Sequence, residues 1–190
     1  MITKCQASEF KAAVLTSPSY LFDEKWEIPH WYAVYTRSRH EKILNRELNQ
    51  RQIESFLPVR KVLRDWSDRK KTIEEPLFKG YLFVRMPLKR RWDVLNSVGA
   101  VRLVGRSNAD PVSLCEEEIL SVRRFMEEKV CADPFPYLRE GDRVFVKSGP
   151  LKGIEGFIVR KDEHCRLVLS LDLIMQSISV QIDGACVEKI

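Results

Sequence analysis

Two kinds of hydrophobic pattern follow each other along this 190-residue chain, and their order limits the folds that it can adopt. Up to about residue 129, short β-rich stretches alternate with stretches of helical spacing. After about residue 139, only β-type alternation with recurring glycines is found. Two prolines, Pro134 and Pro136, lie between the two patterns. The sequence therefore predicts an α+β domain and a small all-β domain, joined by a stiff linker.

The first pattern has the element order of a known fold. Ser38 with Glu41, and Ser113 with Glu116, have the spacing of capping boxes, which marks the starts of two helices. The predicted elements are a strand at 31–36, a helix at 38–52, a strand at 56–59, a polar hairpin at 62–73, a strand at 77–85, a helix at 90–96, a strand at 101–104 and a helix at 113–129. Apart from the hairpin and the last helix, this order is ferredoxin-like, and its helices cover one sheet face. We expect the last helix to pack at an edge or end.

The stretch at 75–85, EPLFKGYLFVR, has large apolar side chains on both faces of the predicted strand. Alternation places Phe78, Leu82 and Val84 on one face. Tyr81 and Phe83 lie on the other face, with Lys79 and Arg85 at its margin. We therefore expect Phe78 to face the helices, and Tyr81 and Phe83 to lie on the open face, where a partner covers them.

Positive charge is concentrated between residues 37 and 91, where sixteen Lys and Arg stand against seven Asp and Glu. Such a block inside a folded domain favours a polyanionic partner, most often nucleic acid. On the predicted helix at 38–52, Arg39, Lys42 and Arg46 fall on one side, opposite Leu44 and Leu48. This basic stripe fits a nucleic-acid contact and equally fits an ordinary solvated face.

Several classes of protein are disfavoured. No apolar run approaches the roughly 20 residues that span a bilayer, and the N-terminus lacks a signal-peptide pattern, so we expect a cytoplasmic protein. The five cysteines include no CxxC pair, which argues against disulfides and structural metal sites. His164 beside Cys165 is a weak hint of a metal ligand. Because no phosphate-binding glycine loop or nucleophile motif is found, we expect no enzyme, no metal and no cofactor.

The C-terminal part alternates four times, around residues 144–146, 157–159, 167–171 and 178–182, and glycines punctuate it. Residues 171–178 also fit helical spacing, but the Val and Ile content favours strands. Five short strands in this length predict a small SH3-like barrel. The expected organisation is an N-terminal extension at 1–29, a ferredoxin-like domain at 30–130, a linker at 131–138 and the barrel at 139–190.

Two stretches together resemble one family. The segment at 141–156, GDRVFVKSGPLKGIEG, is similar to a KOW motif, whose residues here are Gly149, Pro150, Gly153 and Gly156. The stretches WYAVYTR at 31–37 and PLFKGYLFV at 76–84 resemble the NGN domain of NusG-type transcription elongation factors. NGN followed by KOW is specific for that family, and the resemblance covers about residues 30–190. The words WYAVYTRSRHEK, WSDRKK and EPLFKGYLFV resemble the specialised RfaH-like and UpxY-like antiterminators most.

The resemblance implies a transcription elongation or antitermination factor whose NGN domain binds the clamp region of the largest RNA polymerase subunits. The positions that match the polymerase-contact face are Tyr35, Phe78, Tyr81 and Phe83. The family's contacts with non-template DNA correspond broadly to Arg37, Arg39, His40, Lys42 and Arg46. Such a factor works in the bacterial cytoplasm, associated with the nucleoid during transcription.

The resemblance also implies a partner for the KOW domain, either a small-subunit ribosomal protein or the Rho terminator. The matching loop carries Leu173, Ile174 and Met175, which fit a partner-binding tip and equally fit closure of the barrel core. RfaH itself can hold this module as a helical hairpin. The glycine pattern and the alternating strands of this chain predict a barrel instead.

One alternative function remains open at this point. An RNA-binding, translation-linked protein of the RRM type also has a ferredoxin-like sheet with aromatics on its open face. Tyr81 and Phe83 would then stack nucleotides, and the stretch KGYLFV at 79–84 comes close to the RNP1 pattern. Only the pairing of NGN with KOW favours the transcription factor.

Overall fold

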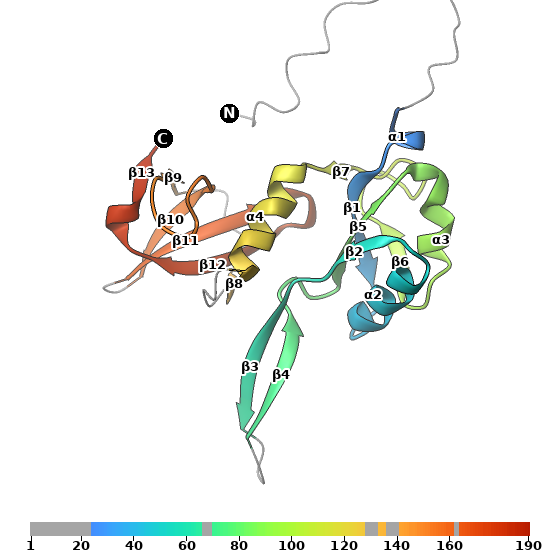
Figure 1. Ribbon diagram of the computed structural model, residues 1–190, viewed down its shortest axis with the longest axis horizontal. Coiled ribbons are helices and arrows are strands. Elements are labelled where there is room, and N and C mark those ends of the chain that lie inside the picture. The colour runs from blue at the N-terminus through green and yellow to red at the C-terminus, as the bar shows by residue number, and fades with distance from the viewer. Residues whose placement is uncertain (1–23, 66–69, 128–132, 136–140, 162–163) are drawn as a thin grey trace, which may run out of the picture.

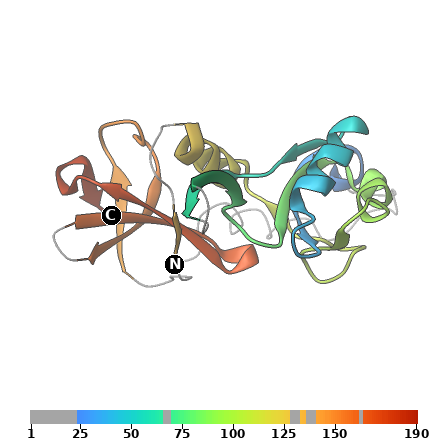
Figure 2. The same ribbon diagram turned by 90° about the horizontal axis from the view of Figure 1, so that it is seen from below.

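The computed structural model of this protein describes residues 24–65, 70–127, 133–135, 141–161 and 164–190. Two antiparallel β-sheets lie at opposite ends of an elongated molecule, and helix α4 (Glu116–Glu127) lies between them (Figure 1). A two-stranded arm projects away from both sheets (Figure 1). Figure 2 shows the same order from below, with α4 and the arm in the middle. The fold is of the α+β class that the sequence predicts.

The first sheet has ferredoxin-like topology. In spatial order its strands are β2 (Glu54–Phe56), β5 (Tyr81–Met86), β1 (His30–Thr36) and β6 (Ala100–Leu103), and β7 (Ser113–Leu114) also pairs with β1. One face is covered by α2 (Glu41–Gln50), the 3-10 turn η1 (Leu88–Arg90) and α3 (Arg91–Leu95). On this side Leu44 and Leu48 of α2 share a buried core with Leu82 and Val84 of β5. The short helix α1 (Glu24–Glu27) precedes β1 and packs near η1.

The arm consists of β3 (Val59–Asp65) and β4 (Lys70–Pro76), paired along their whole length. The polar hairpin expected from the sequence is therefore present, whereas its predicted turn at 66–69 lies outside the described residues. Directly paired residues share a face of a two-stranded ribbon, so Lys61 and Glu74 lie on one face. Arg60 and Glu75 lie on the other.

The second sheet, called the barrel sheet below, contains six antiparallel strands. In spatial order they are β13 (Val187–Lys189), β9 (Asp142–Val146), β10 (Glu155–Lys161), β11 (His164–Leu171), β12 (Gln176–Ile182) and β8 (Asp133–Phe135). The ambiguous segment at 171–178 forms strands on both sides of a 3-10 turn, η2 (Asp172–Ile174), so the strand interpretation is right. A further 3-10 turn, η3 (Gly184–Cys186), leads into β13.

Strand β8 corrects the expected linker at 131–138. Residues 133–135 pair with β12 and extend the barrel sheet. The prolines that suggested a stiff connection do not prevent this, because an edge strand needs hydrogen-bond donors on one side only. Pro134 stands opposite Ile178 at that edge.

Both expected capping boxes are wrong. Helix α2 begins at Glu41 after His40, which makes no side-chain cap, and the Glu41 carboxylate instead accepts a hydrogen bond of 2.8 Å from the Gly80 N–H. Ser113 lies in strand β7. Helix α4 begins two residues later than a Ser113 cap requires, and the Glu118 carboxylate accepts the Cys115 N–H at 3.0 Å. In both cases a carboxylate satisfies a backbone N–H, but a different one from that predicted.

The strand expected at 77–85 is shorter. Phe78 and Gly80 belong to a turn in which the Tyr81 N–H donates to the Phe78 carbonyl, and Gly80 has φ +80°, in the left-handed region that favours glycine. Strand β5 starts at Tyr81, so alternation does not reach back to Phe78. Of the expected N-terminal extension at 1–29, residues 1–23 lie outside the described residues.

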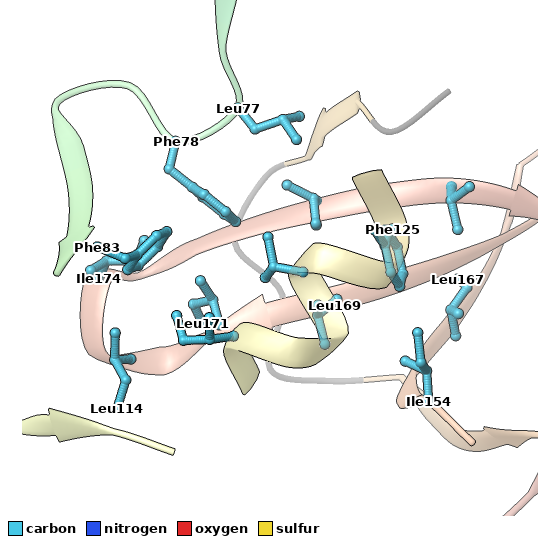
Figure 3. Close-up of a cluster of buried hydrophobic side chains, with 14 of the residues drawn as sticks. Leu77, Phe78, Phe83, Leu114, Phe125, Ile154, Leu167, Leu169, Leu171 and Ile174 are labelled. Atoms are coloured by element: carbon cyan, nitrogen blue, oxygen red, sulfur yellow. The ribbon is translucent and has the colours of Figure 1, made fainter. Parts of the chain in front are cut away.

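Helix α4 packs between the two sheets rather than at an edge or end. Its buried stripe of Ile119, Val122 and Phe125 joins the same hydrophobic cluster as Leu167 and Leu171 of the barrel sheet (Figure 3). This cluster also contains residues of the first sheet. The two sheets therefore share one continuous core through α4.

Candidate functional site

The face of the first sheet opposite α2 and α3, called the open face below, carries alternate residues of β1 and β5. The cross-strand pairs along it are Trp31 with Arg85, Ala33 with Phe83, and Tyr35 with Tyr81. These pairs follow one another from one end of the strands to the other. The structure divides them into a covered end, a buried middle and an exposed end.

Helix α4 covers the Trp31 end. The Arg123 guanidinium lies 5.1 Å from the ring centres of both Trp31 and Phe56, and 3.1 Å from the Glu54 carboxylate. Arg85 also bridges to Glu54 at 3.7 Å. Cation–π contacts and ion pairs thus hold α4 against this end of the face. No local pattern pointed to Arg123, because its partners Trp31, Phe56 and Glu54 lie far away along the chain.

The middle of the open face is buried by the barrel sheet and α4. Phe83 exposes 0% of its surface and Phe78 1%, and their rings pack edge to face with centroids 5.7 Å apart. Ile174 of the barrel sheet belongs to the same cluster and is drawn beside Phe83 in Figure 3. Phe83 lies on the predicted face but is not exposed. Phe78 lies on this side too, not among the helices as alternation suggested.

The exposed end of the open face holds an aromatic and basic group. Tyr35 is 40% exposed, its ring lies edge-on to Tyr81 at 5.5 Å, and the Arg102 guanidinium lies 5.8 Å from its centre. A Cβ at Gly80 would lie 3.4 Å from the Tyr35 ring, so the turn fits closely against it. Two of the four predicted polymerase-contact residues, Tyr35 and Tyr81, thus remain accessible to a partner, Tyr81 partly so.

The loop between β1 and α2 presents Arg37 and Arg39. The Arg37 N–H donates to the Gly99 carbonyl at 2.8 Å, and Arg39 adopts φ +63°, an unusual backbone for a residue other than glycine. Gly99 itself has φ +90°, and a Cβ there would lie 2.5 Å from the His40 Cβ. Both arginines are exposed at this closely packed turn, whereas His40 is half-buried.

The two remaining predicted DNA-contact residues, Lys42 and Arg46, lie further along α2 and are exposed. They line a trench of about 610 Å³ between α2 and the base of the arm. The Lys42 ammonium reaches Glu74 of the arm at 3.1 Å. Arg39 lies in the loop before the helix, so the stripe expected on one helix is shared between a loop and the wall of a trench.

The three residues of the expected partner-binding tip, Leu173 to Met175, differ in exposure. Ile174 is buried in the cluster with Phe83, whereas Met175 is 65% exposed and adopts a left-handed φ of +51°. Leu173 is half-buried against the same cluster. Ile174 therefore does not close the core of an isolated barrel, because it packs against the first sheet as well.

Polar contacts accompany this apolar interface. The Gln176 side-chain amide donates to the Lys79 carbonyl at 3.4 Å, next to the turn that carries Phe78. On the arm, Arg60 forms ion pairs with Glu75 of β4 and with Asp133 of β8. The barrel sheet is thus attached to both the open face and the arm.

The KOW-like glycines serve the loop between β9 and β10. Gly149 and Gly153 have φ of +88° and +91°, and the Gly153 N–H donates to the Val146 carbonyl at 2.8 Å. Gly156 lies where a Cβ would come within 2.7 Å of the Val168 carbonyl oxygen. Pro150 is exposed in this loop. Gly149 and Gly153 thus serve the geometry of the loop, whereas Gly156 allows the close approach of β11 to β10.

Glu118 is a half-buried titratable group at the junction of α4 and the barrel sheet. Burial raises the pKa of its carboxyl, and the negative charges of Asp172 and Glu117 raise it further, while the hydrogen bond from the Cys115 N–H acts in the opposite direction. Asp172 belongs to η2 of the barrel sheet. A carboxylate pair of like charge therefore lies across the interface.

The described ranges contain neither a candidate metal-binding cluster nor a candidate membrane-spanning helix. No group of three or more His, Cys, Asp or Glu side chains there could hold a metal ion. Cys115, Cys165 and Cys186, the cysteines within those ranges, form no disulfide bond with one another. No helix in the described part of the chain is both long enough and apolar enough to cross a membrane.

Comparison with known proteins decides the family. The family model described as "Transcription termination factor nusG" matches residues 29–123, which is half of the chain. The chain belongs to the NusG family. The NusG protein of Borreliella burgdorferi is 26% identical over 181 residues, covering 84% of this chain and 98% of the relative. NusG of Streptococcus pyogenes is 28% identical over 160 residues, covering 79% and 88%.

A solved structure has the same fold. The structure reported as "Domain interaction in Thermotoga maritima NusG" aligns with a TM-score of 0.54 at 22% identity, covering 85% of this chain and 97% of that one. NusG-family proteins are transcription factors rather than enzymes, in agreement with the expectation from the sequence. The expected closeness to RfaH-like and UpxY-like antiterminators stays a prediction, because the relatives named here are NusG proteins.

Proposed function

We propose that this NusG-family protein is a transcription elongation and antitermination factor that binds RNA polymerase through the open face. The observation that carries the proposal is the row of aromatics on that face, from Phe78 and Phe83 to Tyr35 and Tyr81. None of these four side chains belongs to the core under α2 and α3. Large aromatic side chains on the sheet face opposite the helices form a surface that is suited to binding a protein partner.

In the arrangement described here, only part of that face is available. The barrel sheet and α4 cover Phe78 and Phe83, and Ile174 occupies the position that a partner side chain would take. Polymerase therefore contacts Tyr35, Tyr81 and Arg102 first. Phe78 and Phe83 become accessible to polymerase when the barrel sheet separates from the open face. The same separation exposes Ile174, between Leu173 and Met175. The tip then becomes available to a ribosomal protein or to Rho.

Non-template DNA is the second partner in this proposal. Arg37, Arg39 and Arg102 surround the exposed end of the open face, so a protein seated there brings cations close to the nucleic acid in the transcription complex. His40, Lys42 and Arg46 continue this surface along α2. Phosphate contacts of this kind weaken as salt rises. Such a factor acts in the cytoplasm, where transcription takes place.

The test is a binding assay with RNA polymerase from a bacterium whose own NusG-family proteins have been removed. The double variant Tyr35→Ala/Tyr81→Ala loses much of the exposed aromatic area, and we expect polymerase binding to fall at least tenfold. The control is Phe145→Ala on β9, an exposed aromatic of the barrel sheet. Equal binding by the double variant and this control, with both proteins folded by circular dichroism, would refute the assignment of the open face.

A further inference from the structure

A cleft separate from the trench, called the junction cleft below, lies where the base of the arm and the turn before β5 meet the barrel sheet. Its volume of about 610 Å³ is in the size range of sites for small organic ligands, which occur preferentially at domain interfaces. Arg60, Leu77 and Lys79 line one side, and Phe135, Met175 and Gln176 line the other. Because its two sides belong to different parts of the fold, the cleft exists only while the barrel sheet is joined to the rest of the molecule.

Apolar side chains form much of the lining. Leu77 is buried and Phe135 is half-buried, whereas Met175 is largely exposed to solvent beside them. The left-handed φ of +51° at Met175 is strained for a residue with a side chain, and such strain is often found where a ligand is held. A methionine side chain also adapts its shape to an apolar partner. This part of the cleft is therefore suited to the apolar body of a ligand.

Two cations at the cleft are available to an anion. Lys79 is exposed and forms no ion pair with any described residue. Arg60 pairs with Glu75 and Asp133, yet its Nε is buried and has no hydrogen-bond acceptor within the described ranges. A buried donor without an acceptor is costly. The Arg60 side chain is still 27% exposed, so it can turn toward a further acceptor in the cleft.

The same lining disfavours larger ligands. Strand β8 borders the cleft and carries Pro134 in its middle, which has no N–H to offer to an added strand of a partner protein. Asp133 and Glu75, both paired with Arg60, place two carboxylates beside the two cations. These carboxylates repel a polyanion such as nucleic acid. A ligand with a single negative charge fits the balance of charges better.

We propose that the junction cleft binds a small amphiphilic carboxylate. Lys79 and Arg60 hold the carboxylate of the ligand, and Leu77, Phe135 and Met175 contact its apolar part. Because the ligand contacts both sides of the cleft, it stabilises the joined arrangement in proportion to its concentration. It thereby keeps Phe83 covered, and the meaning of this effect for transcription rests on the proposed function.

The test uses the full chain with ¹³C in its methionine methyl groups, and sodium phenylbutyrate as the probe. The phenyl ring should move the Met175 methyl resonance, whereas that of Met86, buried under the helices, should stay in place as the internal reference. Uncharged phenylbutanol should bind about fivefold more weakly, the upper end for a partly exposed ion pair. A Met175 resonance that does not move overturns the proposal. So do equal affinity for the alcohol and an equal response to inorganic phosphate alone.

A matched pair of variants tests the cation. Lys79→Gln removes the charge and keeps a polar side chain of similar length. We expect its Kd for phenylbutyrate to rise about fivefold, because one partly exposed ion pair is lost. The control is Lys147→Gln, which removes an exposed lysine outside the cleft. A Kd for Lys79→Gln within about twofold of that control overturns the proposal.

A second measurement tests the stabilisation of the joined arrangement. Amide hydrogen exchange at Phe83, which is buried in the middle of the open face, should become slower when phenylbutyrate saturates the cleft. Binding without slower exchange at Phe83 overturns this part of the proposal. Neither assay contains polymerase, so their failure leaves the Tyr35→Ala/Tyr81→Ala experiment unaffected. Conversely, a negative result in that experiment leaves the binding of phenylbutyrate to the cleft unaffected.

Discussion

Ile174, next to the exposed Met175 at the end of the barrel sheet, and Phe83, in the middle of the open face, are buried in one hydrophobic cluster. The two side chains belong to surfaces that we assign to different partners, polymerase and a KOW partner. Each surface is therefore covered by the other in this arrangement. The proposed function therefore predicts that binding of either partner is coupled to separation of the two sheets.

Shortening Ile174 should favour that separation. In Ile174→Ala, loss of buried side-chain atoms costs about 2–5 kcal/mol of interface and core stability. We expect faster amide exchange in β5 and stronger polymerase binding than in the parent protein. Met175→Ala is the matched control, because the neighbouring side chain is largely exposed. If both variants show the same exchange in β5, Ile174 does not hold the sheets together.

Glu118 should make the joined arrangement more stable in acid. Its carboxyl has a pKa raised by burial and by the nearby Asp172 and Glu117. A group that binds its proton more tightly when folded stabilises the fold at low pH. This stabilisation is lost as pH rises through the raised pKa. Within the range just above the ordinary value of about 4.5, the contribution of Glu118 to the free energy of unfolding should therefore decrease with pH.

Glu118→Gln should flatten this dependence and increase stability at neutral pH, because the neutral amide carries no charge to bury and can still accept the Cys115 N–H. Chemical denaturation at several pH values measures both effects. Glu117→Gln serves as the comparison, since that carboxyl is exposed and the hydrogen bond from Cys115 lowers its pKa. An unchanged pH slope in Glu118→Gln contradicts the prediction.

Glu41→Ala should loosen the turn that carries Phe78. Glu41 is buried, and its carboxylate accepts the Gly80 N–H at 2.8 Å. Removing it leaves a partly buried donor without its partner, which costs about 1–3 kcal/mol. Thermal unfolding measures the loss. Glu155→Ala, which removes an exposed pair with Arg143, should change stability by much less.

Gly99→Ala and Gly149→Ala separate two reasons for keeping a glycine. Both positions have similar left-handed φ angles, so both substitutions carry backbone strain of about 1–2 kcal/mol. A Cβ at Gly99 also meets the His40 Cβ at 2.5 Å, whereas one at Gly149 meets nothing within 4 Å. We expect Gly99→Ala to be the more destabilising in denaturation and to weaken DNA binding through the Arg37 loop. Equal losses of stability would mean that backbone strain alone matters.

Local patterns predicted the sheets well because alternation and turn residues act over a few positions. The strands at 31–36 and 178–182, and the open face with Tyr35 and Tyr81, follow from such signals. The burial of Phe83 does not, because Ile174 reaches it from a different sheet. Glu41 has the spacing of a capping box, yet its carboxylate binds a turn residue that only tertiary structure brings near.

In the candidate site, too, some residues follow from local patterns and others depend on tertiary structure. Residue type and charge pointed to Arg39, Lys42 and Arg46, and the family resemblance added Arg37. All four are exposed. No sequence pattern pointed to Asn45 and Asn49. Their side-chain amides are oriented by the Ser55 hydroxyl and lie opposite the arm, and only the fold brings these groups together. Strand β8 was missed because Pro134 suggested a linker, although an edge position tolerates it.

Helix α4 sets a condition on how the two sheets can part. Its twelve residues pack Ile119, Val122 and Phe125 into the shared cluster. A helix of this length has marginal stability in water once its apolar stripe loses its partner. Separation of the sheets therefore exposes the part of this stripe that packs on the barrel sheet, while Arg123 keeps α4 on the first sheet. Separation should carry the positive heat-capacity change of a partial unfolding reaction and become steeply more frequent on warming.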